Sequence, residues 1–96
     1  MFLDDKLNEI VENRANYETD NDFSRAIIKT IVSEIPNPEK VSIQEYINKL
    51  RQIEFSFQLF CKRNKGMFKS DWFRNFVLES AGEHKEMFRK ALKWDK

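Results

Sequence analysis

Glycine and proline are scarce in this chain, and their scarcity argues against a β fold. The 96 residues include two Gly and two Pro. An all-β domain needs a turn about every ten residues, and these two residue types form most tight turns. Long runs rich in Lys, Glu, Asn, Ile and Phe separate the few turn residues. The composition therefore favours helices.

Cysteine and histidine, which supply many catalytic and metal sites, occur once each. Cys61 has no second cysteine with which to form a disulfide or a zinc site, and His84 has no second His or Cys to share a metal. Cys61 falls on the same apolar stripe as Phe57, where a buried and unreactive thiol is expected. There is no glycine-rich phosphate loop. We therefore expect no enzyme, no cofactor and no metal.

Long apolar runs are missing as well. No stretch approaches the roughly 20 apolar residues that a membrane-spanning helix needs. The first ten residues, MFLDDKLNEI, carry acids where a signal peptide has bases. The single cysteine suits a reducing compartment. We expect a cytoplasmic protein that does not contact a membrane.

Apolar residues are abundant, by contrast, and many of them are aromatic. Hydrophobic residues make up 41% of the chain, which has nine Phe, two Trp and two Tyr. This is enough apolar mass for a small core without disulfides or a metal. A length of 96 residues fits one domain, and we predict a single helical domain over residues 1–96.

Apolar residues recur at helical spacing in five segments. The predicted helices cover about residues 3–14, 22–35, 42–65, 70–82 and 83–94. Asn21 or Asp22 is the predicted cap of the second helix and Ser70 that of the fourth, while Ser42 and Glu45 form a capping box for the third. We predict an all-α fold, an irregular bundle of four or five helices around the long third helix.

Charge is unevenly distributed, although the net charge is only +1. Residues 1–22 contain seven acids and two bases, whereas residues 61–96 contain ten bases and five acids. Such asymmetry can steer association with a charged partner. The alternative is that the two ends attract each other within the fold.

The segment 61–74 combines bases with aromatic rings and is the candidate nucleic-acid site. Its bases could neutralise phosphates, and exposed rings could stack on unpaired nucleobases. The candidate residues are Lys62, Arg63, Lys65, Lys69 and Arg74 for phosphates, with Phe68 and Trp72 for stacking. The alternative is that the bases complement the end of the third helix while the rings belong to the core. No motif for reading base sequence is present.

Several large apolar residues do not fit one narrow stripe per helix, which suggests that some of them reach the surface. Exposed apolar patches mark protein interfaces, and aromatic residues are enriched at binding hot spots. The candidate interface residues are Phe55, Leu59, Phe73 and Trp94. The alternative is that the short helices are covered on two sides, so that these residues are buried. The partner could be another protein or a second copy of the chain.

Residues 45–57 resemble a stretch of the helicase-loading proteins of T-even bacteriophages. The likeness is carried by Tyr46, Ile47, Leu50, Gln52, Ile53, Phe55 and Phe57, with Lys49 and Arg51 as basic matches. That family is larger and two-lobed, and the resemblance does not extend to most of its N-terminal lobe. The resemblance implies binding of forked or single-stranded DNA and of replication proteins.

A second resemblance connects residues 11–17 and 31–35 with short pieces of the T-even anti-sigma proteins. It implies masking of a host RNA polymerase subunit. Together these features predict a small, non-enzymatic, phage-encoded interaction protein that binds and modulates a protein of the host or phage nucleic-acid machinery. The alternative function is a DNA-binding replication accessory. Nucleic-acid mimicry is less favoured, because only residues 1–22 are markedly acidic.

Overall fold

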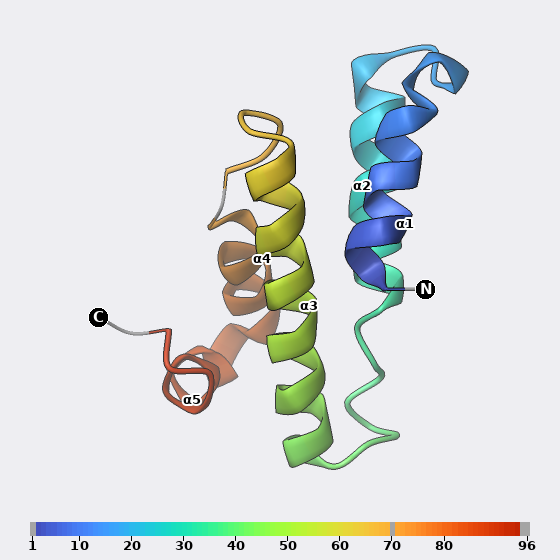
Figure 1. Cartoon of the computed structure of the whole chain (residues 1–96). Coiled ribbons are helices and arrows are strands. Elements are labelled where there is room, and N and C mark those ends of the chain that lie inside the picture. Colours follow the sequence, from blue (N-terminus) through green and yellow to red (C-terminus); the bar gives the residue numbers. More distant parts are fainter. Residues whose placement is uncertain (1, 70, 95–96) are drawn as a thin grey trace.

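The structure, a computed structural model, describes residues 2–69 and 71–94, and all regular elements within these ranges are helical (Figure 1). The α-helices are α1 (Leu3–Glu12), α2 (Asp20–Ser33), α3 (Ile43–Arg63), α4 (Trp72–Ala81) and α5 (Lys85–Ala91). Two 3₁₀ helices, Arg14–Asn16 and Gly82–His84, follow α1 and α4. The all-α prediction is confirmed.

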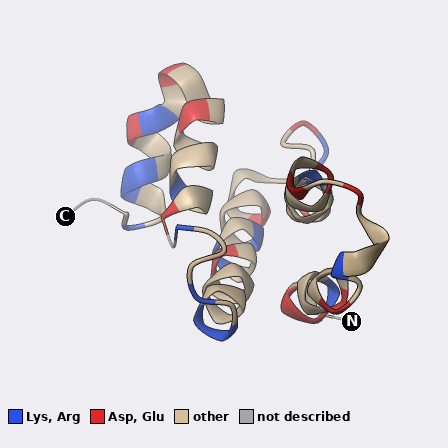
Figure 2. Ribbon diagram, turned by 90° about the horizontal axis from the view of Figure 1, so that it is seen from above, with Lys and Arg blue, Asp and Glu red and all other residues tan. Residues whose placement is uncertain are grey.

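Helix α3, with 21 residues, lies between two pairs of shorter helices. Figure 1 shows α1 and α2 side by side on one flank of α3, with α4 and α5 on the other. The end-on view in Figure 2 shows the same arrangement. Two flanks of α3 are therefore covered by helices.

The helix starts are set by short polar side chains. The Ser42 hydroxyl accepts a hydrogen bond from the Glu45 amide at 3.1 Å, as predicted for α3. The predicted cap of α2 was wrong: the Thr19 hydroxyl accepts from the Asp22 amide, also at 3.1 Å, so that α2 begins at Asp20. This earlier start places Asp20 and Asp22 in the first turn, where the helix dipole favours acids. The predicted cap Ser70 lies outside the described residues.

The two glycines follow helix ends, where the backbone turns. Gly82 directly follows α4 with a φ of +56°, and Gly66 lies in the turn after α3 with a φ of +85°. Side chains with a Cβ atom rarely adopt such angles, so glycine suits both positions. The expected helix ends near these residues are confirmed.

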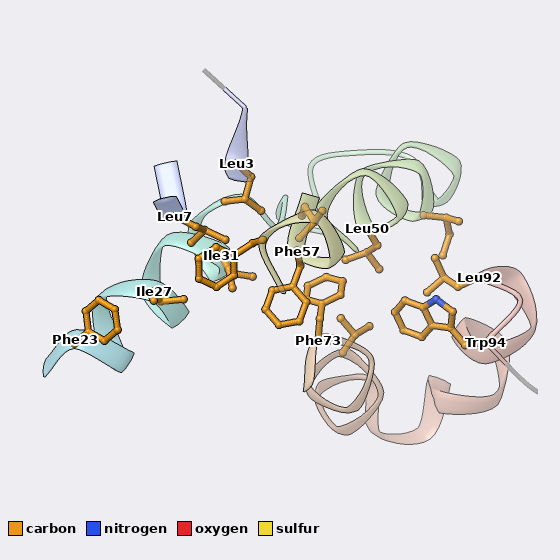
Figure 3. Packing of buried hydrophobic residues seen from close by; sticks show 14 residues of the cluster. Leu3, Leu7, Phe23, Ile27, Ile31, Leu50, Phe57, Phe73, Leu92 and Trp94 are labelled. Atoms are coloured by element: carbon orange, nitrogen blue, oxygen red, sulfur yellow. The ribbon is translucent and has the colours of Figure 1, made fainter. Parts of the chain in front are cut away.

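The core is one cluster that draws on every α-helix except α5, together with two residues that follow α5. It comprises Leu3, Leu7, Phe23, Ile27, Ile31, Ile47, Leu50, Ile53, Phe57, Phe60, Phe73, Val77, Leu92 and Trp94. Figure 3 shows Leu7 and Ile31 on one side of Phe57, with Phe73 on the other. The α3 residues thus join the two helix pairs through a shared interior.

Two of the residues predicted to form a protein interface are buried in this core. Phe73 is 0% exposed and Trp94 is 8% exposed. The prediction that they reach the surface was wrong, because α4 and the residues after α5 turn their apolar sides toward α3 (Figure 3). The alternative, that the short helices are covered, holds for both residues.

Glu54 on α3 holds the C-terminal part of the chain against the bundle. Its carboxylate accepts a hydrogen bond from Arg74 Nε on α4 and another, at 3.2 Å, from Trp94 Nε1. The Arg74 guanidinium also lies over the Trp94 ring, 5.5 Å from its centroid. One acid thus connects α3, α4 and the segment after α5.

Within the described ranges, no helix combines the length and the apolar character needed to cross a bilayer. The longest helix, α3, contains several charged residues, among them Lys49, Arg51 and Glu54.

Candidate functional site

One side of α3 is exposed along its whole length, and we call it the outer face of α3. It consists of Glu45, Asn48, Gln52, Phe55, Leu59 and Lys62, all of which are exposed. These residues follow one another at steps of three and four and so share one side of the helix. The buried residues of α3, such as Leu50 and Phe57, lie on the opposite side.

Two large apolar residues stand in the middle of the outer face. Phe55 is 67% exposed and Leu59 is 40% exposed, so the predicted exposure of both residues is confirmed. Phe2, which directly precedes α1, is 76% exposed and lines a groove together with Phe55 and Leu59. Sequence reasoning missed Phe2, because a single residue outside a helix has no periodic pattern.

The groove beside these residues runs between the start of α1 and the middle of α3. Its volume is about 730 Å³, and Leu3 and Ile53 from the core contribute to its lining. The lining also includes polar side chains, namely Gln52, Ser56, Asp4, Glu34, Lys49 and Arg51. A surface that combines large apolar side chains with polar and charged ones is typical of protein interfaces.

Two of the charged residues that line the groove already have partners within the chain. Glu34 forms an ion pair with Lys6, at 3.5 Å between oxygen and nitrogen. Arg51 donates a hydrogen bond to the carbonyl of Ala91 at 2.6 Å, which ties α3 to the end of α5. Both side chains are therefore held in place by contacts within the chain.

The turn from α3 to α4 carries four of the five predicted phosphate contacts. Lys62, Arg63, Lys65 and Lys69 are exposed, and none of them forms an ion pair with another described residue. We call these four residues the basic turn. Figure 2 shows the basic end of α3 at the edge of the molecule.

The fifth predicted phosphate contact, Arg74, does not join the basic turn. It is bound to Glu54 and lies over the Trp94 ring. A guanidinium held by a carboxylate and an aromatic ring is not a free cation for phosphate. Arg74 instead stabilises the contact between α3 and α4.

The two rings predicted to stack on nucleobases pack against the core. Trp72 stacks on Phe76 at a centroid distance of 5.4 Å and contacts Phe57 at 5.7 Å. Phe68 lies 6.3 Å from Phe57 and 6.5 Å from Phe60. Both Trp72 and Phe68 are half-buried. Their packing matches the alternative, in which these rings belong to the interior.

The acidic N-terminal residues and the basic C-terminal residues do not pair with one another in the described structure. The ion pairs there join Lys6 to Glu34, Arg14 to Asp20, Arg74 to Glu54, His84 to Glu83 and Arg89 to Glu86. None of these pairs joins residues 1–22 to residues 61–94. The charge asymmetry therefore remains available for contacts outside the chain.

The single cysteine and the single histidine have different surroundings: Cys61 is half-buried, whereas His84 is exposed. Burial raises the pKa of the Cys61 thiol, which keeps the sulfur protonated at neutral pH and weakens it as a nucleophile. His84 is exposed, and its nearest acid is the neighbouring Glu83, at 3.9 Å. No described cluster of three or more His, Cys, Asp or Glu residues could hold a metal ion.

Comparison with known proteins gave no matching family model, no matching curated protein and no matching solved structure. The candidate site is therefore defined by its own residues. These are the outer face of α3 with Phe2, and the basic turn that follows α3.

Proposed function

We propose that this chain is a non-enzymatic interaction protein that binds another protein through Phe2, Phe55 and Leu59. The observation that carries the proposal is the exposure of these three side chains around one groove. Removing a large apolar side chain from water yields about 1.5–3 kcal/mol. Aromatic residues near the centre of an interface commonly dominate its binding energy. A partner that covers the groove would remove these side chains from water, and this free energy would favour binding.

The resemblance to phage helicase-loading proteins supports a partner from nucleic-acid machinery. Four of the residues that carry the resemblance, namely Ile47, Leu50, Ile53 and Phe57, are buried and serve the fold. Arg51, Gln52 and Phe55 are exposed, and Gln52 and Phe55 lie on the outer face of α3. We propose a phage-encoded protein that acts in the cytoplasm, where a free Cys61 thiol stays reduced, and alters the activity of its bound partner.

Replacing both Phe55 and Leu59 with Asp tests this proposal. The two carboxylates would have to be desolvated at the interface, so we expect the amount of bound partner to fall by about tenfold or more. The measurement is affinity capture from bacterial lysate, quantified by mass spectrometry. The fold should persist, because both side chains are exposed.

A matched control is Met87→Asp, which places the same charge on an exposed apolar residue of α5 outside the groove. This variant should capture the same proteins as the wild type, and circular dichroism should give equal helix content for all three chains. A set of captured proteins that does not change in the double variant would contradict the proposal.

Binding of single-stranded or forked DNA is the second candidate function. One observation favours it: the four cations of the basic turn are exposed and lack described ion-pair partners. Closely spaced free cations attract the phosphate backbone and release its counterions. Contact through phosphates alone would favour nucleic acid without reading its sequence.

Replacing the four residues of the basic turn with Ala tests this second function. If all four contact phosphates, the logarithm of the binding constant for single strands should fall with the logarithm of salt concentration with a slope of roughly −3. The quadruple variant should lose this binding in an anisotropy titration. The control replaces four exposed bases outside the basic turn, Lys29, Lys40, Lys85 and Lys90, with Ala. Equal affinity of the two variants would exclude the basic turn.

A further inference from the structure

We infer that the outer face of α3 pairs with the same face of a second copy of this chain, with the two helices antiparallel. The inference rests on the proposed function in one respect, since it takes this face to be the binding surface. It goes further by naming the occupant and its orientation. The resulting dimer would be symmetric about a two-fold axis.

The spacing of the outer face is that of a coiled-coil seam. Its residues lie at 45, 48, 52, 55, 59 and 62, so that steps of three and four alternate without a break. This is the heptad spacing, in which every residue of the stripe can face a partner helix. The whole stripe is exposed, and it spans nearly all of α3. A partner helix could therefore lie along its full length.

The charges at the two ends of the stripe, Glu45 and Lys62, favour a second copy as the partner and an antiparallel orientation of the two helices. In an antiparallel pair centred on the stripe, position 45 faces 62 of the other copy, 48 faces 59, and 52 faces 55. Glu45 of each copy then lies beside Lys62 of the other copy, which forms two attractive contacts. A parallel pair would place Glu45 beside Glu45 and Lys62 beside Lys62, which is repulsive at both ends. The stripe is thus complementary to itself in the antiparallel direction alone.

The apolar residues fall near the centre of this arrangement. Phe55 of one copy would contact Gln52 and Phe55 of the other, with Leu59 in the next layer on each side. Phe2, which lines the same groove, would cover the flank of the seam. Only two of the six stripe positions are apolar, so we expect a reversible dimer that forms with increasing protein concentration.

Sedimentation velocity over a series of protein concentrations tests the inference. The average mass of the wild-type species in solution should rise with concentration from 11.6 kDa, the mass of one chain, toward twice that value. Glu45→Lys and Lys62→Glu should each raise the dissociation constant roughly tenfold, because either change turns two attractive contacts into repulsive ones. An equimolar mixture of these two variants should dimerise again, since both end contacts of the mixed pair then join a lysine of one copy to a glutamate of the other.

The mixture also guards against loss of folding, because a misfolded variant would not be rescued by its counterpart. A wild-type chain that stays monomeric at every concentration would overturn the inference, as would single variants that dimerise like the wild type. The proposed function would still stand if Phe55→Asp with Leu59→Asp lost its captured partner. Conversely, suppose that the wild-type chain dimerises as expected while the Phe55→Asp, Leu59→Asp double variant captures the same lysate proteins as the wild type. The proposed function would then be refuted and the inference would stand.

Discussion

Phe57→Ala is expected to lower the free energy of unfolding by about 3–5 kcal/mol. Phe57 is fully buried at the middle of the core. The centroid of its ring lies within 6.4 Å of the ring centroids of Phe60, Phe68, Trp72 and Phe73. Removing the ring leaves a cavity between the two helix pairs that α3 joins (Figure 3). Domains of this size have only about 5–15 kcal/mol of stability in total. The variant should therefore unfold at a much lower urea concentration.

The chain supplies a matched control two residues away. Phe55→Ala makes the same change on the same helix, but at an exposed position. Its free energy of unfolding should stay within about 0.5 kcal/mol of the wild-type value. Urea titrations followed by circular dichroism measure both variants. Similar losses for Phe55→Ala and Phe57→Ala would mean that the burial of Phe57 is not what stabilises the bundle.

Glu54→Ala is expected to cost about 2 kcal/mol, because it removes an acceptor with two partners. The Glu54 side chain is 16% exposed, and it accepts from Arg74 and from Trp94 Nε1. Its loss would leave the indole N–H of a buried Trp94 without this acceptor. The Arg74 side chain is 42% exposed, so water screens its end of the ion pair and limits the cost.

Two further variants separate the charge of Glu54 from its hydrogen bonds. Glu54→Gln keeps an acceptor for Trp94 while removing the charge that attracts Arg74. Its free energy of unfolding, measured by urea titration, should therefore lie between those of the wild type and Glu54→Ala. Glu86→Ala removes an exposed ion pair with Arg89 on α5, and it should cost about 0.5 kcal/mol or less. If Glu54→Ala were no more destabilising than Glu86→Ala, the contact of Glu54 with the C-terminal part would be unimportant for stability.

The helices themselves could be predicted from the sequence, because their signals are local. Residues three or four apart share one side of a helix, so Leu50, Ile53 and Phe57 mark the buried side of α3 before any neighbour is known. Ser42 and Gly82 mark helix ends through a hydroxyl acceptor and a positive φ. The start of α2 was misplaced because Thr19, Asn21 and Asp22 are all acceptable caps, and only the backbone conformation distinguishes them.

The surface, by contrast, was decided by residues far apart in the chain. Phe55 and Phe73 look alike in the sequence, yet Phe73 is buried in the core whereas Phe55 is 67% exposed beside the groove. Arg74 and Arg63 are both bases of one segment, yet Glu54 binds only Arg74. Local spacing therefore determined where the helices run and which sides are apolar. The tertiary structure decided which apolar and charged residues remain free, because burial depends on which helices come to lie side by side.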